Sequence, residues 1–82
     1  MDIKDELRRI ISKLKNDEQL YLSIDEQTDI INEIGLDSLQ MISLLLEIEE
    51  TFDIIIDYEL IDINKLQNLS TIETMINETS MK

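Results

Sequence analysis

Apolar residues recur in the first part of the chain with the period of an amphipathic helix. The apolar positions are Ile3, Leu7, Ile10, Ile11 and Leu14. Asp2 can cap the N-terminus of this helix, and Lys13 and Lys15 lie in its last turn, where positive charge offsets the helix dipole. The pattern predicts a helix over residues 3–15.

The helical pattern weakens over residues 16–36, where polar residues interrupt a few apolar ones. We expect a long connection in which residues 29–34 form a short helical turn. This turn would end at Gly35, the one glycine of the chain, which suits a positive φ. A connection of this length inside a compact domain indicates a functional segment or one with structure of its own.

The strongest helical pattern follows Asp37, a candidate N-cap, and predicts a helix over residues 38–51. Its apolar stripe consists of Leu39, Ile42, Leu45, Leu46 and Ile48. Met41 and Leu44 add apolar residues beyond one stripe. We therefore expect this helix either to be buried on a wide face or to offer apolar groups to a partner.

The last third of the chain predicts three further segments. Three isoleucines at positions 54–56 have strand preference but no second strand to pair with, so we expect an extended connector pinned by one or two of them. An apolar cluster predicts one brief helix near residues 58–63. Ser70 and Glu73 form a capping-box pattern, which predicts a last helix over residues 71–79.

These elements predict an all-α fold, a small helical bundle of three main helices plus one short helix, in a single domain over residues 1–82. One glycine and no proline disfavour an all-β sandwich, which needs many turns. The net charge of −12 is typical of disordered chains, but the hydrophobic content of 43% supplies enough aliphatic side chains for a core.

The composition excludes several functions. Nineteen acidic residues against seven basic ones repel nucleic acid and anionic membranes. The absence of histidine and cysteine excludes Ser-His-Asp and Cys-His nucleophiles, disulfides and zinc sites with nitrogen or sulfur ligands. No apolar stretch is long enough to span a membrane, and no basic region followed by an apolar one opens the chain, so we expect a soluble cytoplasmic protein.

The many carboxylates could in principle form a catalytic acid/base pair or a calcium-binding loop. A catalytic acid needs a pKa raised by burial, whereas nearly every Asp and Glu lies on a polar helix face or in a loop. Residues 25–33 lack the central glycine and the alternating ligands of a calcium loop. We expect no catalytic residue and no metal site.

The Asp37-Ser38-Leu39 triplet, taken alone, is most simply a helix start. Together with its surroundings it resembles the acyl carrier protein family over most of the chain. The segments that carry the resemblance are Ile34-Gly35-Leu36-Asp37-Ser38-Leu39, Leu44-Leu45-Leu46-Glu47-Ile48-Glu49-Glu50, Phe52-Asp53-Ile54-Ile55-Ile56 and Ser70-Thr71-Ile72.

The resemblance implies that Ser38 carries a 4′-phosphopantetheine arm, which a phosphopantetheinyl transferase supplies from coenzyme A, with Asp37 as its motif neighbour. The carrier would hold acyl or aminoacyl groups as thioesters on this arm while partner enzymes perform the chemistry. A phosphodiester on Ser38 also suits the N-terminus of a helix. Asp37 opposes it only weakly, because water and salt screen exposed charges.

The resemblance further implies a partner surface on the second helix, which would meet basic patches of loading and processing enzymes. The expected partner contacts are Leu39, Met41, Leu46, Glu47, Glu49 and Glu50. Leu39 is expected at the surface, whereas Met41 and Leu46 have a core position as an equal alternative. The three glutamates can equally form a solvated helix end; as partner contacts they would speed encounter more than tighten binding. We expect a monomer.

Several residues differ from those usual in acyl carrier proteins, and these differences indicate in which kind of biosynthetic pathway the carrier would act. Gln40 and Ser43 stand where fatty-acid carriers usually have acidic residues, and Asp57 stands where a proline often ends the connector. Leu36 before the triplet is similar to acyl rather than peptidyl carriers, while residues 44–50 also resemble the D-alanyl carrier of cell-wall modification. We therefore expect a carrier in one specialised biosynthetic pathway, polyketide, nonribosomal or related.

Two other functions stay open. An unmodified acidic helical adaptor would bind a basic partner through Glu47, Glu49 and Glu50, and its function would survive Ser38→Ala. A small carboxylate enzyme would lose turnover when one Asp or Glu is changed.

Overall fold

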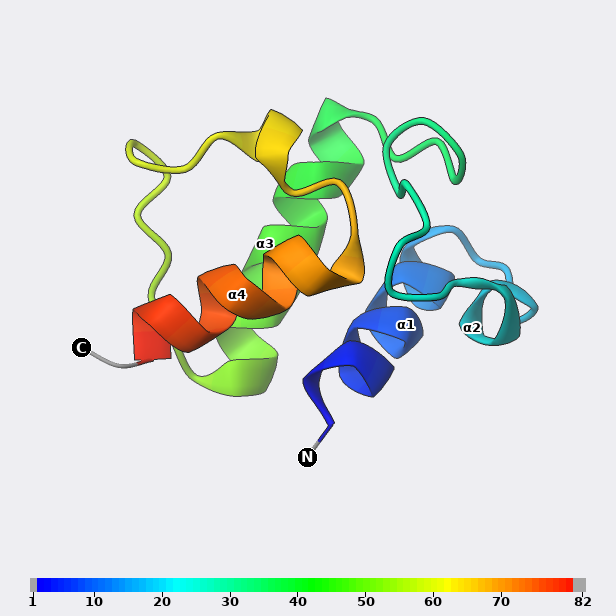
Figure 1. Ribbon diagram of the computed structural model, residues 1–82, viewed down its shortest axis with the longest axis horizontal. Coiled ribbons are helices and arrows are strands. Elements are labelled where there is room, and N and C mark those ends of the chain that lie inside the picture. Colours follow the sequence, from blue (N-terminus) through cyan, green and yellow to red (C-terminus); the bar gives the residue numbers. More distant parts are fainter. Residues whose placement is uncertain (1, 81–82) are drawn as a thin grey trace.

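The computed structural model describes residues 2–80, with the backbone alone at Ser80. The helices of this part are α1 (Ile3–Leu14), α2 (Leu20–Ser23), α3 (Ser38–Phe52), the 3-10 helix η1 (Ile63–Lys65) and α4 (Leu69–Ser80) (Figure 1). The all-α fold with three main helices and a short one is confirmed. No helix among these residues is both long enough and apolar enough to cross a membrane.

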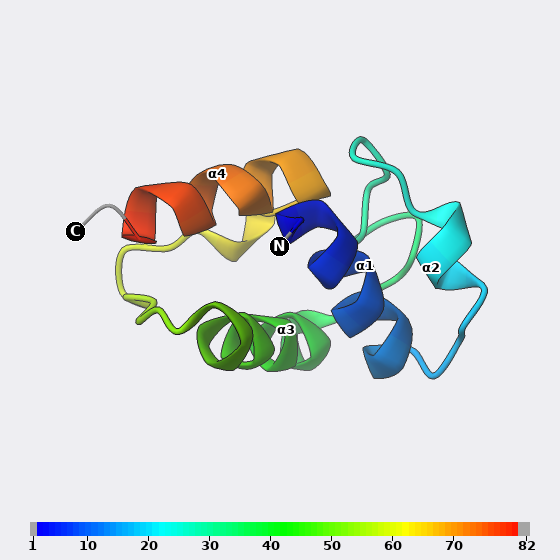
Figure 2. The same cartoon turned by 90° about the horizontal axis from the view of Figure 1, so that it is seen from below.

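The three main helices enclose one hydrophobic core. Helix α1 packs against α2, α3 and α4, and Figure 2 shows α3 and α4 on opposite sides with α1 at one end between them. The fully or nearly buried side chains are Leu7, Ile10, Ile11, Ile24, Ile30, Leu36, Met41, Leu44, Leu45, Ile48, Ile56, Leu66, Leu69, Ile72 and Ile76. Five of these come from the long connections, so the loops contribute to the core as well as the helices.

Helix α1 follows its predicted pattern. The Asp2 carboxylate accepts hydrogen bonds from the N–H groups of Lys4 and Asp5 at 3.0 and 3.3 Å, which confirms the N-cap. The side chains of the predicted stripe are buried or half-buried. Lys4 links the helix to two other parts of the fold, since its ammonium lies 2.8 Å from Glu26 and 3.5 Å from Glu73.

Helix α2 was not predicted, because its few apolar residues show no sustained period. A turn leads into it, in which the Asp17 carboxylate accepts from the N–H of Gln19 at 3.0 Å. Tyr21 holds it against α1: its hydroxyl donates to Asp5, and the guanidinium of Arg9 lies 5.3 Å from the ring centroid. These contacts are tertiary, so no local sequence pattern signals them.

The predicted helix near residues 58–63 is wrong. Residues 58–60 form a turn instead, and the 3-10 helix begins at Ile63. Two aspartates explain the difference, because each accepts a hydrogen bond from the N–H two residues further on and so starts a turn. These are Asp57, which accepts from Glu59 at 3.0 Å, and Asp62, which accepts from Asn64 at 3.0 Å.

Helix α4 begins earlier than predicted, and Ser70 is not its cap. The capping residue is Asn68, whose side chain accepts from the N–H of Thr71 at 3.0 Å while the Thr71 hydroxyl accepts from the Asn68 N–H at 3.3 Å. Because the helix starts at Leu69, the side chain of Leu69 is completely buried. Burial of Leu69 therefore favours the Asn68 cap over the Ser70 capping box.

Replacing Asn68 by alanine should lower the free energy of unfolding by about 1 kcal/mol, because the N-terminus of α4 loses its cap. Ser70→Ala is the matched control and should change stability little, since Ser70 lies inside the helix. Urea denaturation followed by circular dichroism measures both. A larger loss from Ser70→Ala than from Asn68→Ala would contradict this cap assignment.

Candidate functional site

The chain approaches α3 through the predicted helical turn, which the structure confirms. The Asp29 carboxylate accepts from the N–H groups of Ile31 and Asn32 at 3.0 and 2.9 Å and so starts a turn over residues 30–33. Gly35 then adopts a φ of +85°. A Cβ at Gly35 would meet no atom within 4 Å, so its left-handed backbone, and not space, calls for glycine here.

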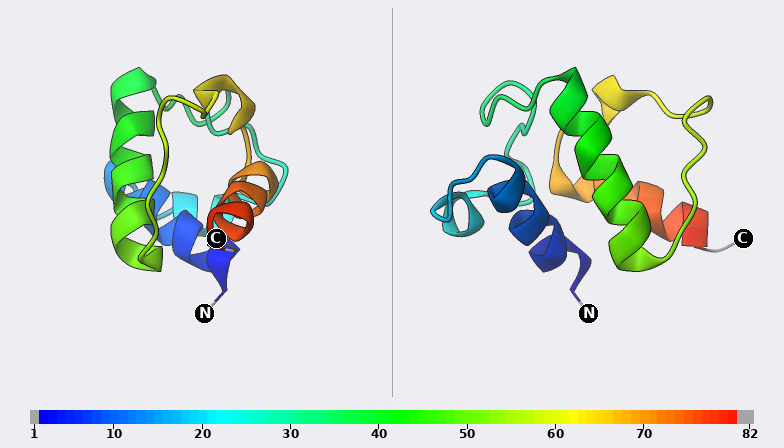
Figure 3. Two further views of the ribbon diagram at one scale, coloured as in Figure 1. Left: turned by 90° about the vertical axis from the view of Figure 1, so that its left-hand side faces the viewer. Right: turned by 180° about the vertical axis from the view of Figure 1, so that it is seen from behind.

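Buried side chains and backbone hydrogen bonds fix the segment that leads into α3. Leu36 is buried, and its N–H donates to the carbonyl of Ile30 at 3.0 Å. Ile30 is itself fully buried, and its N–H donates to the carbonyl of Gln67 at 2.8 Å. The start of α3 is therefore held in place although the connection before it is long. Figure 3 shows η1 at the same end of the molecule.

Asp37 caps α3, as predicted. Its carboxylate accepts from the N–H of Gln40 at 2.8 Å, and the Gln40 side chain accepts from the Asp37 N–H at 3.2 Å, which completes a capping box. Gln40, which departs from the acidic residue usual in fatty-acid carriers, thus has a structural role in this chain.

Ser38 is the first residue of α3 and is exposed. Within residues 2–80 its hydroxyl has no hydrogen-bond partner, and the N–H groups of Ser38 and Leu39 have no acceptor. Unpaired N–H groups at a helix start, added to the helix dipole, favour a negatively charged group. The residues present therefore fit a phosphodiester attached at Ser38.

Helix α3 buries only part of the predicted stripe, together with the two apolar residues predicted beyond it. Its core residues are Met41, Leu44, Leu45 and Ile48. Leu39 and Leu46, two turns apart on the other side, are 75% and 53% exposed. Met41 is 1% exposed, so its core position holds and it adds nothing to a partner surface in this conformation. Glu47 and Glu50 lie exposed beside the two leucines.

Glu49 has a structural role that sequence reasoning missed. Helix α3 ends at Phe52, with Asp53 as its C-cap, and the segment after it, residues 53–62, is called the connector below. The Glu49 carboxylate accepts from the N–H of Ile56 at 2.8 Å and from the hydroxyl of Tyr58 at 2.7 Å. Glu49 therefore pins the connector to α3, together with the buried side chain of Ile56, and is less free for a partner than Glu47 and Glu50.

These hydrogen bonds displace two pKa values. The Ile56 N–H and then the Tyr58 hydroxyl stabilise the charged carboxylate and hold the pKa of Glu49 below its usual value. Partial burial, followed by the bond to Glu49, raises the pKa of Tyr58 to about 12. The pair is thus most stable with Glu49 ionised and Tyr58 protonated.

The stabilisation from this pair should disappear at both ends of the pH scale. For Glu49 the folded pKa is lowered, so its stabilisation is present above the unfolded pKa of 4.5 and lost as pH falls through the folded value. For Tyr58 the folded pKa is raised, so its stabilisation is present below pH 10 and lost as pH rises towards about 12. The pH dependence of this stabilisation is measured from the melting temperatures of wild type, Glu49→Gln and Tyr58→Phe over a range of pH.

Below pH 4.5 the melting-temperature difference between wild type and Glu49→Gln should narrow, and above pH 10 the difference between wild type and Tyr58→Phe should narrow. Glu50→Gln, one residue along, is the control and should run parallel to wild type throughout. Differences that stay constant with pH would contradict the role of the pair.

Hydrogen bonds displace the pKa values of four carboxyl groups in the described part of the chain. The carboxyl groups with clearly displaced pKa values are Asp5, Asp25, Asp29 and Glu49. All four pKa values are lowered, and the largest cause in each is a hydrogen bond to the carboxylate: from the Tyr21 hydroxyl to Asp5, and from the N–H groups of Gln27, Asn32 and Ile56 to Asp25, Asp29 and Glu49. No cluster of three metal-ligating side chains occurs in this part of the chain.

A groove of about 600 Å³ lies away from Ser38. Its lining comes from α1, α2 and the C-terminal half of α3, and includes Arg9, Tyr21, Glu47 and Thr51. Both acidic and basic side chains line this groove, so the groove does not have one sign of charge.

A comparison with protein-family models identifies the family of the chain. The model described as "Phosphopantetheine attachment site" matches residues 5–77. No curated protein matches the chain significantly. Domains of this family are non-catalytic, carry 4′-phosphopantetheine on a serine, and interact with the phosphopantetheinyl transferase and with loading enzymes. The chain therefore belongs to the phosphopantetheine attachment site family and is a phosphopantetheine-binding carrier domain.

Proposed function

We propose that Ser38 is the attachment residue, and that the chain carries acyl or aminoacyl intermediates in a specialised biosynthetic pathway, polyketide, nonribosomal or related. The main support for Ser38 as the attachment residue is that it is an exposed serine at the first position of α3, beside two unpaired N–H groups. When attached, the arm supplies a thiol that forms thioesters, which this cysteine-free chain does not have.

Comparison with the other serines supports Ser38. The hydroxyls of Ser12 and Ser23 donate to carbonyls of their own helices at 2.9 Å each. Ser43 and Ser70 are partly buried within α3 and α4. Of the serine side chains that the structure describes, Ser38 combines exposure, a free hydroxyl and a helix start, so a transferase can reach it and an anion is tolerated there.

In this proposal the neighbours of Ser38 have separate roles. Asp37 and Gln40 hold the backbone of the helix start in place. Leu39 and Leu46 offer apolar contact to a partner, and Glu47 and Glu50 add negative charge beside them. We propose this exposed face of α3 as the surface that meets the transferase and the loading enzymes. Attraction between it and a basic patch would raise the rate of encounter.

The combined Glu47→Gln and Glu50→Gln change should lower kcat/KM of a phosphopantetheinyl transferase for this carrier several-fold at low ionic strength, because encounter slows when the charge is removed. The combined change of Glu59 and Glu78, both exposed and neither on α3, to glutamine is the charge-matched control. Initial rates at low and high salt measure the effect. Equal losses in both variants would mean that net charge alone matters.

The proposal is tested by the intact mass of the purified protein before and after incubation with coenzyme A and a broad-specificity phosphopantetheinyl transferase. We expect a gain of one arm, with the modified peptide containing Ser38. A gain on another serine would overturn the site. No gain in a folded sample would favour the acidic adaptor.

A further inference from the structure

The connector presents one edge of its backbone to solvent. The N–H groups of Ile54 and Ile56 point towards α3, since they donate to the carbonyl and the carboxylate of Glu49 at 3.2 and 2.8 Å. In an extended chain, successive residues present their N–H groups to opposite sides. The N–H groups of Ile55 and Asp57 therefore point away from α3, and neither has an acceptor within residues 2–80.

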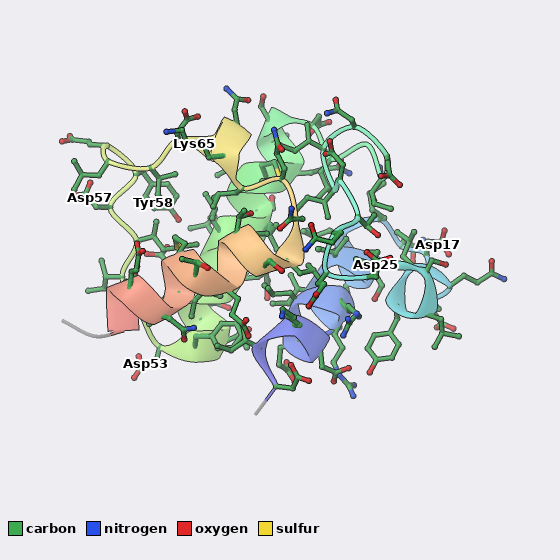
Figure 4. The ribbon with its side chains drawn as sticks, viewed as in Figure 1. Asp17, Asp25, Asp53, Asp57, Tyr58 and Lys65 are labelled. Carbon is green, nitrogen blue, oxygen red and sulfur yellow. The ribbon has the colours of Figure 1, made fainter. Side chains whose placement is uncertain are left out.

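The exposure of the side chains agrees with an extended backbone over this segment. Ile55 is 86% exposed, Ile56 is buried and Asp57 is exposed again, which is the alternation of a strand with one face on the core. Figure 4 shows Asp57 on the outer side of the connector and Tyr58 on the side towards α3. The segment thus has the geometry of an edge strand without a sheet.

The surroundings of this edge combine apolar surface with negative charge. Leu60 is 79% exposed, close in sequence to the exposed Ile55. Four exposed carboxylates lie along the connector, and no ion pair within residues 2–80 involves them: Asp53, Asp57, Glu59 and Asp62. A partner that pairs here gains most if it brings apolar side chains and positive charge.

We propose that residues 54–57 form a pairing edge for an extended segment of a partner protein in which apolar and basic residues alternate. The backbone of Ile55 and the N–H of Asp57 would pair with that segment, while its basic residues would face the four carboxylates. A second copy of this chain is a poorer occupant, because it would bring the same four carboxylates against them. The edge is separate from Ser38 and from the exposed face of α3.

The test is titration of the isotope-labelled 82-residue chain with a peptide of three Lys-Val repeats, followed by NMR. We expect the amide signals of Ile55 and Asp57 to shift and their hydrogen exchange to slow. The same peptide with every backbone amide methylated keeps the charge but has no N–H to donate to the Ile55 carbonyl, and its methyl groups hinder close pairing. It should bind about tenfold more weakly or worse. A peptide of three Glu-Val repeats should not bind.

Two variants of one residue separate backbone from side chain. Ile55→Pro removes the unpaired N–H, whereas Ile55→Ala keeps it and removes the side chain. Proline suits an extended chain and this N–H makes no internal bond, so both variants should fold. We expect the proline variant to lose binding of the Lys-Val peptide and the alanine variant to keep it within a few-fold.

The proposal is overturned if the methylated and unmethylated peptides bind equally, if only signals from α3 shift, or if the Lys-Val peptide does not bind. If Ile55→Pro fails to fold, the comparison of the two peptides on the wild-type protein decides. Loading of Ser38 is measured by mass in a separate experiment, so failure of either proposal leaves the other standing.

Discussion

Replacement of Ser38 by alanine is expected to abolish loading of the 4′-phosphopantetheine arm completely while leaving the fold intact. The hydroxyl oxygen is the atom that would form the phosphodiester, and alanine offers none. The Asp37–Gln40 capping box remains in the variant, so the start of α3 should keep its geometry. Intact mass after incubation with coenzyme A and a transferase measures loading, and far-UV circular dichroism measures the fold.

Ser43→Ala is the matched control for this result, since Ser43 lies in the same helix but away from its start. It should accept one arm as the wild type does. Loading of Ser38→Ala would show that another residue is modified, whereas partner binding unchanged by Ser38→Ala, with no loading of the wild type, would favour the adaptor.

The largest loss of stability is expected from Leu45→Ala. Leu45 is completely buried in the middle of α3, so the change removes apolar contacts and leaves a cavity, which costs about 2–5 kcal/mol. A small domain has a free energy of unfolding of only about 5–15 kcal/mol. We therefore expect a fall in melting temperature of about 10 °C or more.

Leu46→Ala provides a control one residue away with the same chemical change. Leu46 is 53% exposed, so its truncation leaves no enclosed cavity and should cost far less stability than that of Leu45. Urea denaturation of the two variants compares them directly. Equal losses would mean that α3 is buried on a different face from the one described. A loss of transferase activity confined to Leu46→Ala would instead support the partner surface.

The sequence by itself determined the helices that have strong local patterns. The period of apolar residues in α1 and α3 is a property of consecutive residues, and so is the ability of Asp2 and Asp37 to cap the helix that follows each of them. Gly35 was found for the same reason, because a left-handed backbone before a helix needs glycine. The triplet around Ser38 likewise lies within one short stretch of chain.

Only the tertiary structure decided which apolar residues are buried, which residue caps α4 and which backbone group Glu49 binds. Helix α3 has more apolar residues than one face can bury, so its packing partners placed Met41 in the core and left Leu39 and Leu46 outside. Asn68 prevails over Ser70 as the cap because the earlier start buries Leu69. Glu49 reaches the connector seven residues further on only after the chain has turned at Asp53. Each of these outcomes depends on contacts between distant segments, which a pattern of neighbouring residues does not contain.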